Sequence, residues 1–261
     1  MAKMIKGKKW GLAATLLIGA LFVFLPLGSA TEFSFRDGGK GRHSLAAYRW
    51  ILQQPDFLHY LGLSLELALL TAVITLLLVV PTVVWLHLRA ESLRPLIEFL
   101  TILPLVIPVV ALSIGAQTAF PSALQSTQFE LPLMYVILAL PYSFRALDIG
   151  IRAIPLKTIS EAARGLGANW PRTIFYVIAP VMRSAVVGAS FLTLALSLGE
   201  FTLTSLLHWD TFPTWVTTVS QQSIIGAIAL SVFSLGAAFF LLFTIGLVTT
   251  RSKRQAMEAV E

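Results

Sequence analysis

The chain contains no cysteine among its 261 residues. It therefore has no disulfide, no thiolate nucleophile and no cysteine-ligated metal, and its cysteine content leaves the redox compartment open. Charge is also scarce, because 12% of the residues are charged and 56% are hydrophobic. Soluble domains carry about 25% charged residues. This deficit excludes an ordinary water-soluble fold.

Motifs for catalysis are missing as well. No Gly-x-x-x-x-Gly-Lys-Ser/Thr phosphate loop occurs, so we expect this chain neither to bind nor to hydrolyse ATP. No Gly-x-Ser-x-Gly nucleophile motif is present. The four histidines lack metal-ligand spacing and are interpreted as satisfied interfacial side chains (His43, His59, His87 and His208). We expect a non-catalytic protein without a metal site or a cofactor of its own.

Long apolar runs dominate what is present. A membrane helix needs roughly 20 mostly apolar residues. Six segments qualify, at about 10–30, 62–88, 96–120, 131–150, 184–207 and 227–250. We predict an all-α integral membrane protein with six transmembrane helices. Pro104 and Pro108 interrupt the third run and Pro141 the fourth, so these helices should kink or unwind unless neighbours satisfy the freed carbonyls.

Lysine and arginine predict the orientation of the spans. With the N-terminus inside, 15 of the 19 basic residues fall in cytoplasmic segments, and the other four lie in the 31–61 loop. Both termini are therefore predicted to be cytoplasmic. The net charge is +6, but the basic residues lie beside the apolar runs and form no single basic face, which argues against nucleic acid as a partner. The first run also resembles a signal peptide, but its length from Trp10 to Leu27 favours an uncleaved anchor.

The segment 158–180 is amphipathic and basic, and it lies between the fourth and fifth apolar runs on the predicted cytoplasmic side. Thr158 and Glu161 have the spacing of a capping box. A narrow stripe of mostly small apolar residues follows (Ile159, Ala162, Ala163 and Leu166). Gly165 and Gly167 should end this short helix. Asn169 should cap a second helix, with Pro171 in its first turn. These patterns leave two interpretations open. The segment is either a docking element for another protein or a bent connection that packs only on its own helical bundle.

The spacing of this segment resembles the EAA loop of bacterial ABC-importer permeases. That loop reads Glu-Ala-Ala, three residues, Gly, nine residues, then Ile-x-Leu-Pro. This chain has Glu161-Ala162-Ala163, then Gly167, then Val177-Ile178-Ala179-Pro180. Val177 and Ala179 depart from the pattern but keep its apolar character. The six-span layout is similar to the type I importer permeases, especially the branch for polyamines, sulfate, iron, thiamine and phosphonate.

The resemblance implies a set of partners and roles. The ATPase-coupling residues would be Glu161, Ala162, Ala163, Arg164, Gly167 and Pro180. The partners would be a cytoplasmic ABC ATPase dimer that binds ATP and magnesium, a second permease subunit, an extracytoplasmic solute-binding protein and membrane lipid. The domains would be an N-terminal transmembrane helix at 1–30, an extracytoplasmic loop at 31–61 and a permease core at 62–250. The core contains the coupling loop at 151–183, and a cytoplasmic tail follows at 251–261. The protein would be a multi-pass importer subunit of the bacterial inner membrane, and a polyamine is the first candidate solute.

Polar side chains inside apolar spans are candidates for the translocation path, because burying them in the bilayer is costly. Glu200 is the best candidate, with Ser197 and Thr202 near it in the sequence; Gln117 and Glu66 are weaker. The alternative is that Glu200 is protonated or paired and purely structural. The cluster of Trp209, Asp210, Phe212 and Trp215 is interpreted as an aromatic belt at the outer interface (rather than a contact to a docking protein).

Two other functions remain open on the sequence. A secondary transporter or channel would need no ATP, but it predicts paired intramembrane charges and an internal repeat, and neither is evident. A membrane scaffold would have no use for Glu200. The 31–61 loop is polar, with glycines between residues 38 and 41 at its tip and a short interfacial helix expected near Trp50.

Overall fold

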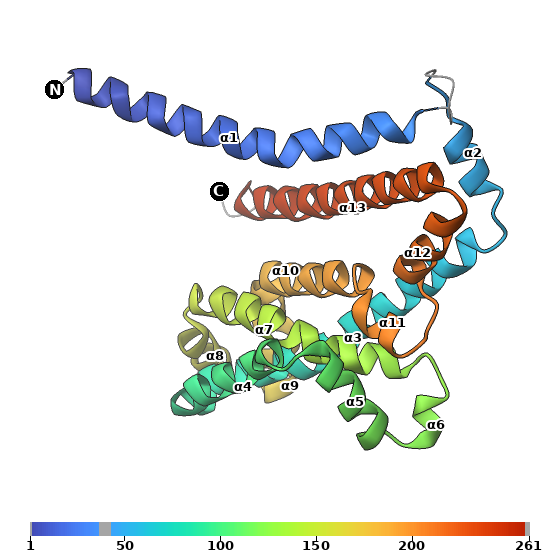
Figure 1. Ribbon diagram of the computed structural model, residues 1–261. Helices are drawn as coiled ribbons and strands as arrows, with labels where there is room; N and C mark the ends of the chain where they lie inside the picture. Colours follow the sequence, from blue (N-terminus) through green and yellow to red (C-terminus); the bar gives the residue numbers. More distant parts are fainter. Residues whose placement is uncertain (1, 37–42, 259–261) are drawn as a thin grey trace. The chain divides into compact units, whose positions relative to one another are not determined.

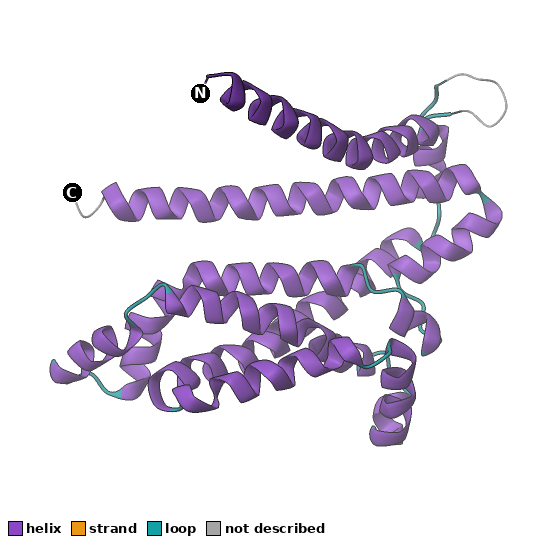
Figure 2. Cartoon of the chain, turned by 60° about the vertical axis from the view of Figure 1, so that its left-hand side comes forward, coloured by secondary structure: helices purple, strands orange, loops and turns teal. Residues whose placement is uncertain are grey.

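The computed structural model describes residues 2–36 and 43–258 of the chain. Helices make up almost all of the regular structure in these residues, and the described part contains one isolated antiparallel bridge, between Arg36 and His43 (Figure 2). The predicted all-helical class is therefore confirmed. The glycine-rich tip predicted at 38–41 lies outside the described residues.

The elements follow one another with short connections (Figure 1). They are α1 (Ala2–Ser34), α2 (Ala46–Leu52), α3 (Phe57–Arg89), η1 (Glu91–Leu93), α4 (Arg94–Val106), α5 (Val109–Ala119), α6 (Ser122–Gln125), α7 (Glu130–Arg152), α8 (Leu156–Gly165), α9 (Trp170–Arg172), η2 (Thr173–Ile178), α10 (Ala179–Leu198), α11 (Thr202–Leu206), α12 (Phe212–Gln222) and α13 (Ile224–Glu258).

Four helical stretches are long and apolar enough to cross a membrane: Ala14–Ser34, Phe57–Arg89, Glu130–Arg152 and Trp170–Leu206. A fifth is obtained when η1–α4 and α5, bent by 102°, are taken as one broken span. Ile224–Phe240 is a shorter apolar helix. These stretches follow the order of the six predicted runs. Length and composition in the described residues support four or five crossings, and the count of six remains a prediction.

Two compact units make up the chain. One contains residues 1–57 and 215–240, and the other contains 58–214 and 241–261. The second unit holds α3 from Leu58 onward and the elements up to α11, and therefore every candidate site residue. Within it, α7 packs lengthwise against α10 and α4 packs against α7 (Figure 1).

The break in the third run falls at Pro108, as predicted. Ile107 is extended, with φ −78° and ψ 124°, which is the conformation that a following proline favours. Pro104 lies inside α4 and Pro141 inside α7, and neither interrupts its helix. The predicted break at Pro108 is therefore confirmed, the helices do not unwind at Pro104 and Pro141, and a kink at these two residues stays a prediction.

The core at one end of the second unit is built from α3, α7 and α10. Its largest fully buried side chains there are Leu86, Phe144, Leu147, Ile151, Ile178 and Met182. Gly150 on α7 lies directly against Ala185 on α10, and a Cβ at position 150 would overlap the Ala185 side chain. The absence of a side chain at Gly150 lets the two helices approach closely.

The predicted aromatic belt is wrong for two of its members. Trp215 is 8% exposed and lies against Phe57, with ring centroids 6.1 Å apart and the rings tilted by 50°. Phe212 is 7% exposed, and its backbone N–H donates to the Ser64 hydroxyl at 2.8 Å. Both side chains are buried within the chain by residues distant in sequence, so they are not available at the membrane interface. Asp210 is exposed.

Candidate coupling segment and polar cavity

The helix α8 begins earlier than the sequence predicts. Pro155 precedes its first residue, and the Pro155 carbonyl accepts the first helical hydrogen bond from the Ile159 N–H at 3.1 Å. Thr158 therefore lies inside the first turn, where no side-chain cap is formed. The predicted capping box of Thr158 and Glu161 is wrong, because the proline starts the helix two residues before it.

One face of α8 packs on its own bundle and the other is exposed. Leu156 and Ser160 are buried, and Ile159 and Ala163 are half-buried. Leu156 and Ile159 belong to the core formed with α3, α7 and α10. The predicted stripe is thus correct for Ile159 and Ala163 only, because the inward face is shifted toward the N-terminus by Leu156.

The exposed face consists of the coupling candidates. Glu161, Ala162 and Arg164 are exposed, and so is Gly167. Leu166 follows them with 91% of its surface exposed, the highest value among the exposed large hydrophobic residues of the described chain. Ala162 and Gly167 are small and lie in the same segment as the exposed Leu166 and the charged Glu161 and Arg164. This surface therefore offers both apolar and charged groups to another protein.

A glycine turn ends α8, as predicted. Gly167 has φ +87°. Its N–H donates to the Arg164 carbonyl at 2.9 Å, and the Ala168 N–H donates to the Ala163 carbonyl at 3.0 Å. This pair of bonds is a Schellman motif, which needs a left-handed residue at the position of Gly167. Gly165 is the last residue of the helix itself.

The second helix of the segment is capped as predicted. The Asn169 side chain accepts a hydrogen bond from the Arg172 N–H at 3.0 Å, and Pro171 lies in the first turn. The helix then widens into a π-helical stretch, η2, before α10 begins with Pro180 at its start. Pro180 has no N–H to donate to the Tyr176 carbonyl and crowds it, so a wider turn fits there.

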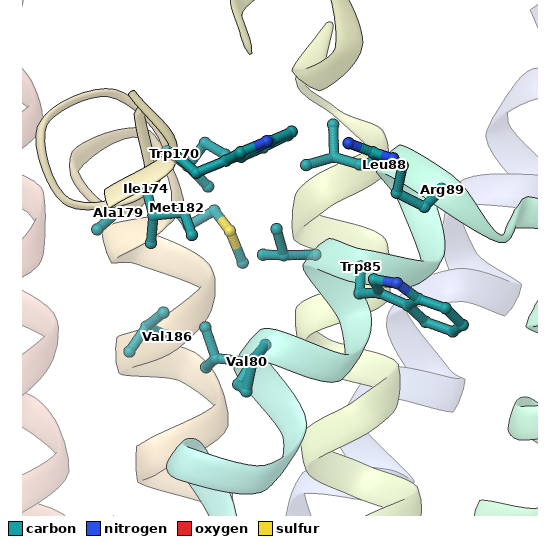
Figure 3. A pocket seen from close by; sticks show the side chains of 12 residues that line it. Val80, Trp85, Leu88, Arg89, Trp170, Ile174, Ala179, Met182 and Val186 are labelled. Carbon is teal, nitrogen blue, oxygen red and sulfur yellow. The ribbon is translucent and has the colours of Figure 1, made fainter. Parts of the chain in front are cut away.

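Trp170 joins three elements at this corner. The Arg164 guanidinium from α8 lies 4.8 Å from the centre of a ring of Trp170, and the Arg89 guanidinium from the end of α3 lies 5.4 Å from it. Such cation–π contacts contribute about 0.5–1 kcal/mol each at exposed sites. Trp170 and Arg89 also border an apolar groove of about 420 Å³ between α3 and α10. Figure 3 shows Met182 and Val186 on the α10 side of this groove and Val80 on the α3 side.

Sequence reasoning missed a buried carboxylate on α7, the helix that precedes α8 in the chain. Asp148 on α7 is 0% exposed. Arg94 binds it through two bonds, Nε to Oδ1 at 2.7 Å and a terminal nitrogen to Oδ2 at 3.0 Å. Arg152 binds Oδ2 at 2.8 Å, and His87 Nε2 lies 3.5 Å from Oδ1. The only sequence signal was Arg152 four residues after Asp148, since Arg94 and His87 are distant along the chain.

Further ion pairs extend this cluster toward α8. Lys157 on α8 binds Glu91 on η1 at 2.8 Å. On α4, Glu98 pairs with Arg145 of α7 and lies 3.6 Å from Arg94. We call Asp148, Arg94, Arg152, Glu98 and Arg145, together with the Lys157–Glu91 pair, the ionic cluster. It connects η1, α4, α7 and α8.

Glu200 lines a small cavity of about 150 Å³. Ser197 lines it too, so the structure brings these two candidates together. The remaining walls come from α4, α7 and α10 (Leu105, Tyr135, Leu138, Tyr142 and Leu196). Glu200 Oε1 accepts a hydrogen bond from the Leu203 N–H at 2.8 Å, which fixes the start of α11. Glu200 therefore has a structural contact and a position on the cavity wall.

The other polar candidates lie elsewhere. Thr202, Gln117 and Glu66 are exposed and do not line this cavity. A second buried carboxylate, Glu130, was not predicted. It is 0% exposed at the start of α7 and accepts a hydrogen bond from Trp209 Nε1 at 2.6 Å. Its other oxygen has no partner among the described residues.

Several helices long and apolar enough to cross a membrane, an exposed face on α8 and a cavity lined by Glu200 are features of a multi-pass membrane protein. The chain is similar to the spermidine/putrescine transport system permease protein PotB of Salmonella typhimurium and of Salmonella typhi. It is 28% identical to each over 210 residues, covering 72% of this chain and 72% of each relative. No protein-family profile matches the chain. The resemblance to transport permeases of the polyamine branch is thereby confirmed.

Proposed function

We propose that this chain is the transmembrane permease subunit of an ATP-driven, binding-protein-dependent importer of a small solute. The exposed face of α8 carries the proposal. It presents Glu161, Ala162 and Arg164 and ends in Leu166, which is 91% exposed. The opposite face of α8 is anchored in the core, so a force applied to the exposed face would be passed to the bundle.

The proposed partner at α8 is a cytoplasmic ABC ATPase dimer. It would bind ATP and magnesium, and this chain would remain non-catalytic and without a cofactor. Glu161, Ala162 and Ala163 would line the contact, with Arg164 beside them. Gly167 would set the turn behind the contact, and Pro180 would end the segment. Arg164 also lies on Trp170, so its role would be to tie the contact to the following helix.

The proposed arrangement in the membrane follows the basic residues. The chain would cross the bacterial inner membrane six times, with both termini and α8 on the cytoplasmic side. A second permease subunit would supply the other half of the path, and an extracytoplasmic binding protein would deliver the solute. The proposed order along the chain is a membrane anchor at 1–30, an outer loop at 31–61, the permease core at 62–250 and a cytoplasmic tail at 251–261.

A polyamine is the first candidate solute. The named relatives belong to a spermidine/putrescine transport system. The cavity also favours a cation, because it combines the Glu200 carboxylate with the aromatic rings of Tyr135 and Tyr142, and both groups attract ammonium. Ser197 would add a hydroxyl, while Thr202 and Gln117 would act at other points of the path. Phosphonate, thiamine and ferric iron are the next candidates.

Co-purification tests the coupling assignment. The chain is expressed with its ATPase, and the amount of ATPase retained after purification is measured. Glu161→Lys and Gly167→Asp should leave the chain in the membrane, release the ATPase and abolish uptake. Asp210→Lys, which reverses an exposed carboxylate on the predicted outer side, serves as the matched control and should retain the ATPase. Retention of the ATPase and of uptake in both test variants would show the assignment to be wrong.

The energy source is tested with reconstituted vesicles. Uptake of radiolabelled spermidine and putrescine should require ATP together with the ATPase and the binding protein. Uptake that proceeds without ATP would instead indicate a secondary transporter or channel. Measuring which solute the partner binding protein binds would identify the transported compound.

A further inference from the structure

The ionic cluster joins α8 to the bent third span through side chains that are far apart in sequence. Lys157 and Glu91 are 66 residues apart, and Arg94 and Asp148 are 54 residues apart. Glu91 and Arg94 lie on adjacent elements, η1 and α4, whose chain is continuous. A path of ion pairs and backbone therefore runs from α8 through η1 to α4.

Asp148 attaches α4, the last element of this path, to α7. Its carboxylate is completely buried and is held by Arg94 from α4 and Arg152 from α7. The bidentate Arg94 contact sets both the distance and the orientation of the start of α4 against α7. A lone carboxylate at this depth would be costly, so the geometry depends on all partners being present.

The far end of α4 reaches the cavity that contains Glu200. Leu105, near the C-terminus of α4, lines that cavity together with residues of α7 and α10. A joint displacement of α4 and α7 would therefore move these walls of the cavity relative to α10. Packed helices usually transmit such a displacement by switching between two discrete arrangements and not by bending gradually.

We propose that Asp148 is the positioning residue that holds α4 against α7, so that α8, η1, α4 and α7 move as one body and displacement of α8 moves the α4 and α7 walls of the Glu200 cavity relative to its α10 wall. The transport role of this movement rests on the proposed function. The Lys157–Glu91 pair is exposed and contributes little to stability. Its role is to keep α8 in register with η1.

Loss of the Asp148 charge tests this role through the coupling ratio, the amount of solute imported per ATP hydrolysed. In Asp148→Asn and Arg94→Lys the ATPase remains bound, and the ratio should fall about tenfold, within the range of measured coupling energies. A merely structural role would lower uptake and hydrolysis together and leave the ratio unchanged, which would overturn the proposal. Arg94→Lys keeps the charge and loses the bidentate geometry, so it provides the same test if Asp148→Asn fails to fold.

A cross-link provides the converse test. Because the chain has no cysteine, Glu91→Cys with Lys157→Cys places the only two thiols, and a short bifunctional thiol reagent can join them. If α8 and η1 move together, the cross-linked protein keeps the uptake of the two single variants treated in the same way. Loss of uptake on cross-linking means that the two elements move apart during transport, and the proposal is wrong.

A distance measurement separates this proposal from the proposed function. Spin labels on Thr158→Cys of α8 and Leu100→Cys of α4 should give one narrow distance distribution, which broadens in Asp148→Asn. This measurement needs neither ATP nor solute. An unchanged distribution overturns the proposal even if wild-type uptake is ATP-driven. A broadened distribution without ATP-driven uptake by the wild type supports the rigid body and rejects the importer function.

Discussion

Gly167 combines a left-handed backbone with an exposed position at the end of α8. The sequence correctly predicts the turn at Gly167 and the helix cap at Asn169, because both signals are local. A glycine turn and an asparagine cap depend on neighbouring backbone groups only. Asp148 is the opposite case, since its carboxylate is satisfied by Arg94 from another helix, and no local pattern predicts that contact.

Alanine substitutions of Gly165 and Gly167, at the end of α8, distinguish the effect of backbone conformation on stability from the effect of a steric clash. A Cβ at either position meets no atom within 4 Å. Gly167→Ala should still lower the free energy of unfolding by about 1–2 kcal/mol, because alanine in the left-handed region is strained. Gly165→Ala should raise it by roughly 0.5–1 kcal/mol, since that residue is helical. Chemical denaturation in detergent micelles, followed by circular dichroism, measures both; equal effects would contradict the assigned turn.

Glu200 offers a similar separation between its charge and its backbone contact. Glu200→Gln keeps an oxygen that accepts from the Leu203 N–H and removes the charge. We expect normal stability but at least about tenfold lower uptake of a cationic solute, since a hydrogen bond to a charged group contributes roughly 1.5–3 kcal/mol. Glu200→Ala should reduce stability as well. Wild-type uptake by Glu200→Gln would favour the purely structural interpretation of this residue.

At the scale of the elements, the sequence predicts where the helices lie along the chain better than it predicts the residues at which they begin and end. The predicted runs correspond to helices, but α8 begins at Leu156 because Pro155 precedes it, and the capping pattern at Thr158 is a coincidence of spacing. Pro108 breaks the third run and Pro141 does not break α7. Pro141 is buried within α7, which continues through it, so the same residue type ends one helix and lies inside another.

The close approach of α7 and α10 at Gly150 gives a prediction for these two helices. Gly150→Ala would force its Cβ into the Ala185 side chain, and overpacking of this kind typically costs about 1–3 kcal/mol. Gly188→Ala on α10 is the matched control, because a Cβ there meets no atom within 4 Å. It should be neutral or slightly stabilising, since alanine favours a helix more than glycine does. Thermal melting of the purified protein distinguishes the two variants, and equal melting temperatures would contradict the packing.

At the scale of the whole molecule, the orientation in the membrane is the property that most affects function. The predicted sidedness places α8 in the cytoplasm and the 121–130 segment outside. The described residues contain four or five candidate spans and a shorter apolar helix, Ile224–Phe240. The proposed ATPase contact at α8 requires a cytoplasmic location, so the sidedness of the chain is tested directly.

Single cysteines in this cysteine-free chain report the sidedness. Ser126→Cys and Thr158→Cys both introduce a thiol at an exposed position. In intact cells, a membrane-impermeant maleimide should label the thiol at position 126 and leave the thiol at position 158 unlabelled until the membrane is permeabilised. Labelling of position 158 from outside would contradict both the topology and the proposed ATPase contact.

The sequence by itself determined the helical membrane class, the order of the apolar runs, the glycine turn at Gly167 and the cap at Asn169. These features depend on composition and on interactions within one turn of backbone. Only the tertiary structure decided which face of α8 is buried, which of the candidate polar residues share a cavity with Glu200, and that Asp148 holds α4 against α7. The physical reason is that burial and ion pairing are set by side chains tens of residues away, and their positions follow from helix packing.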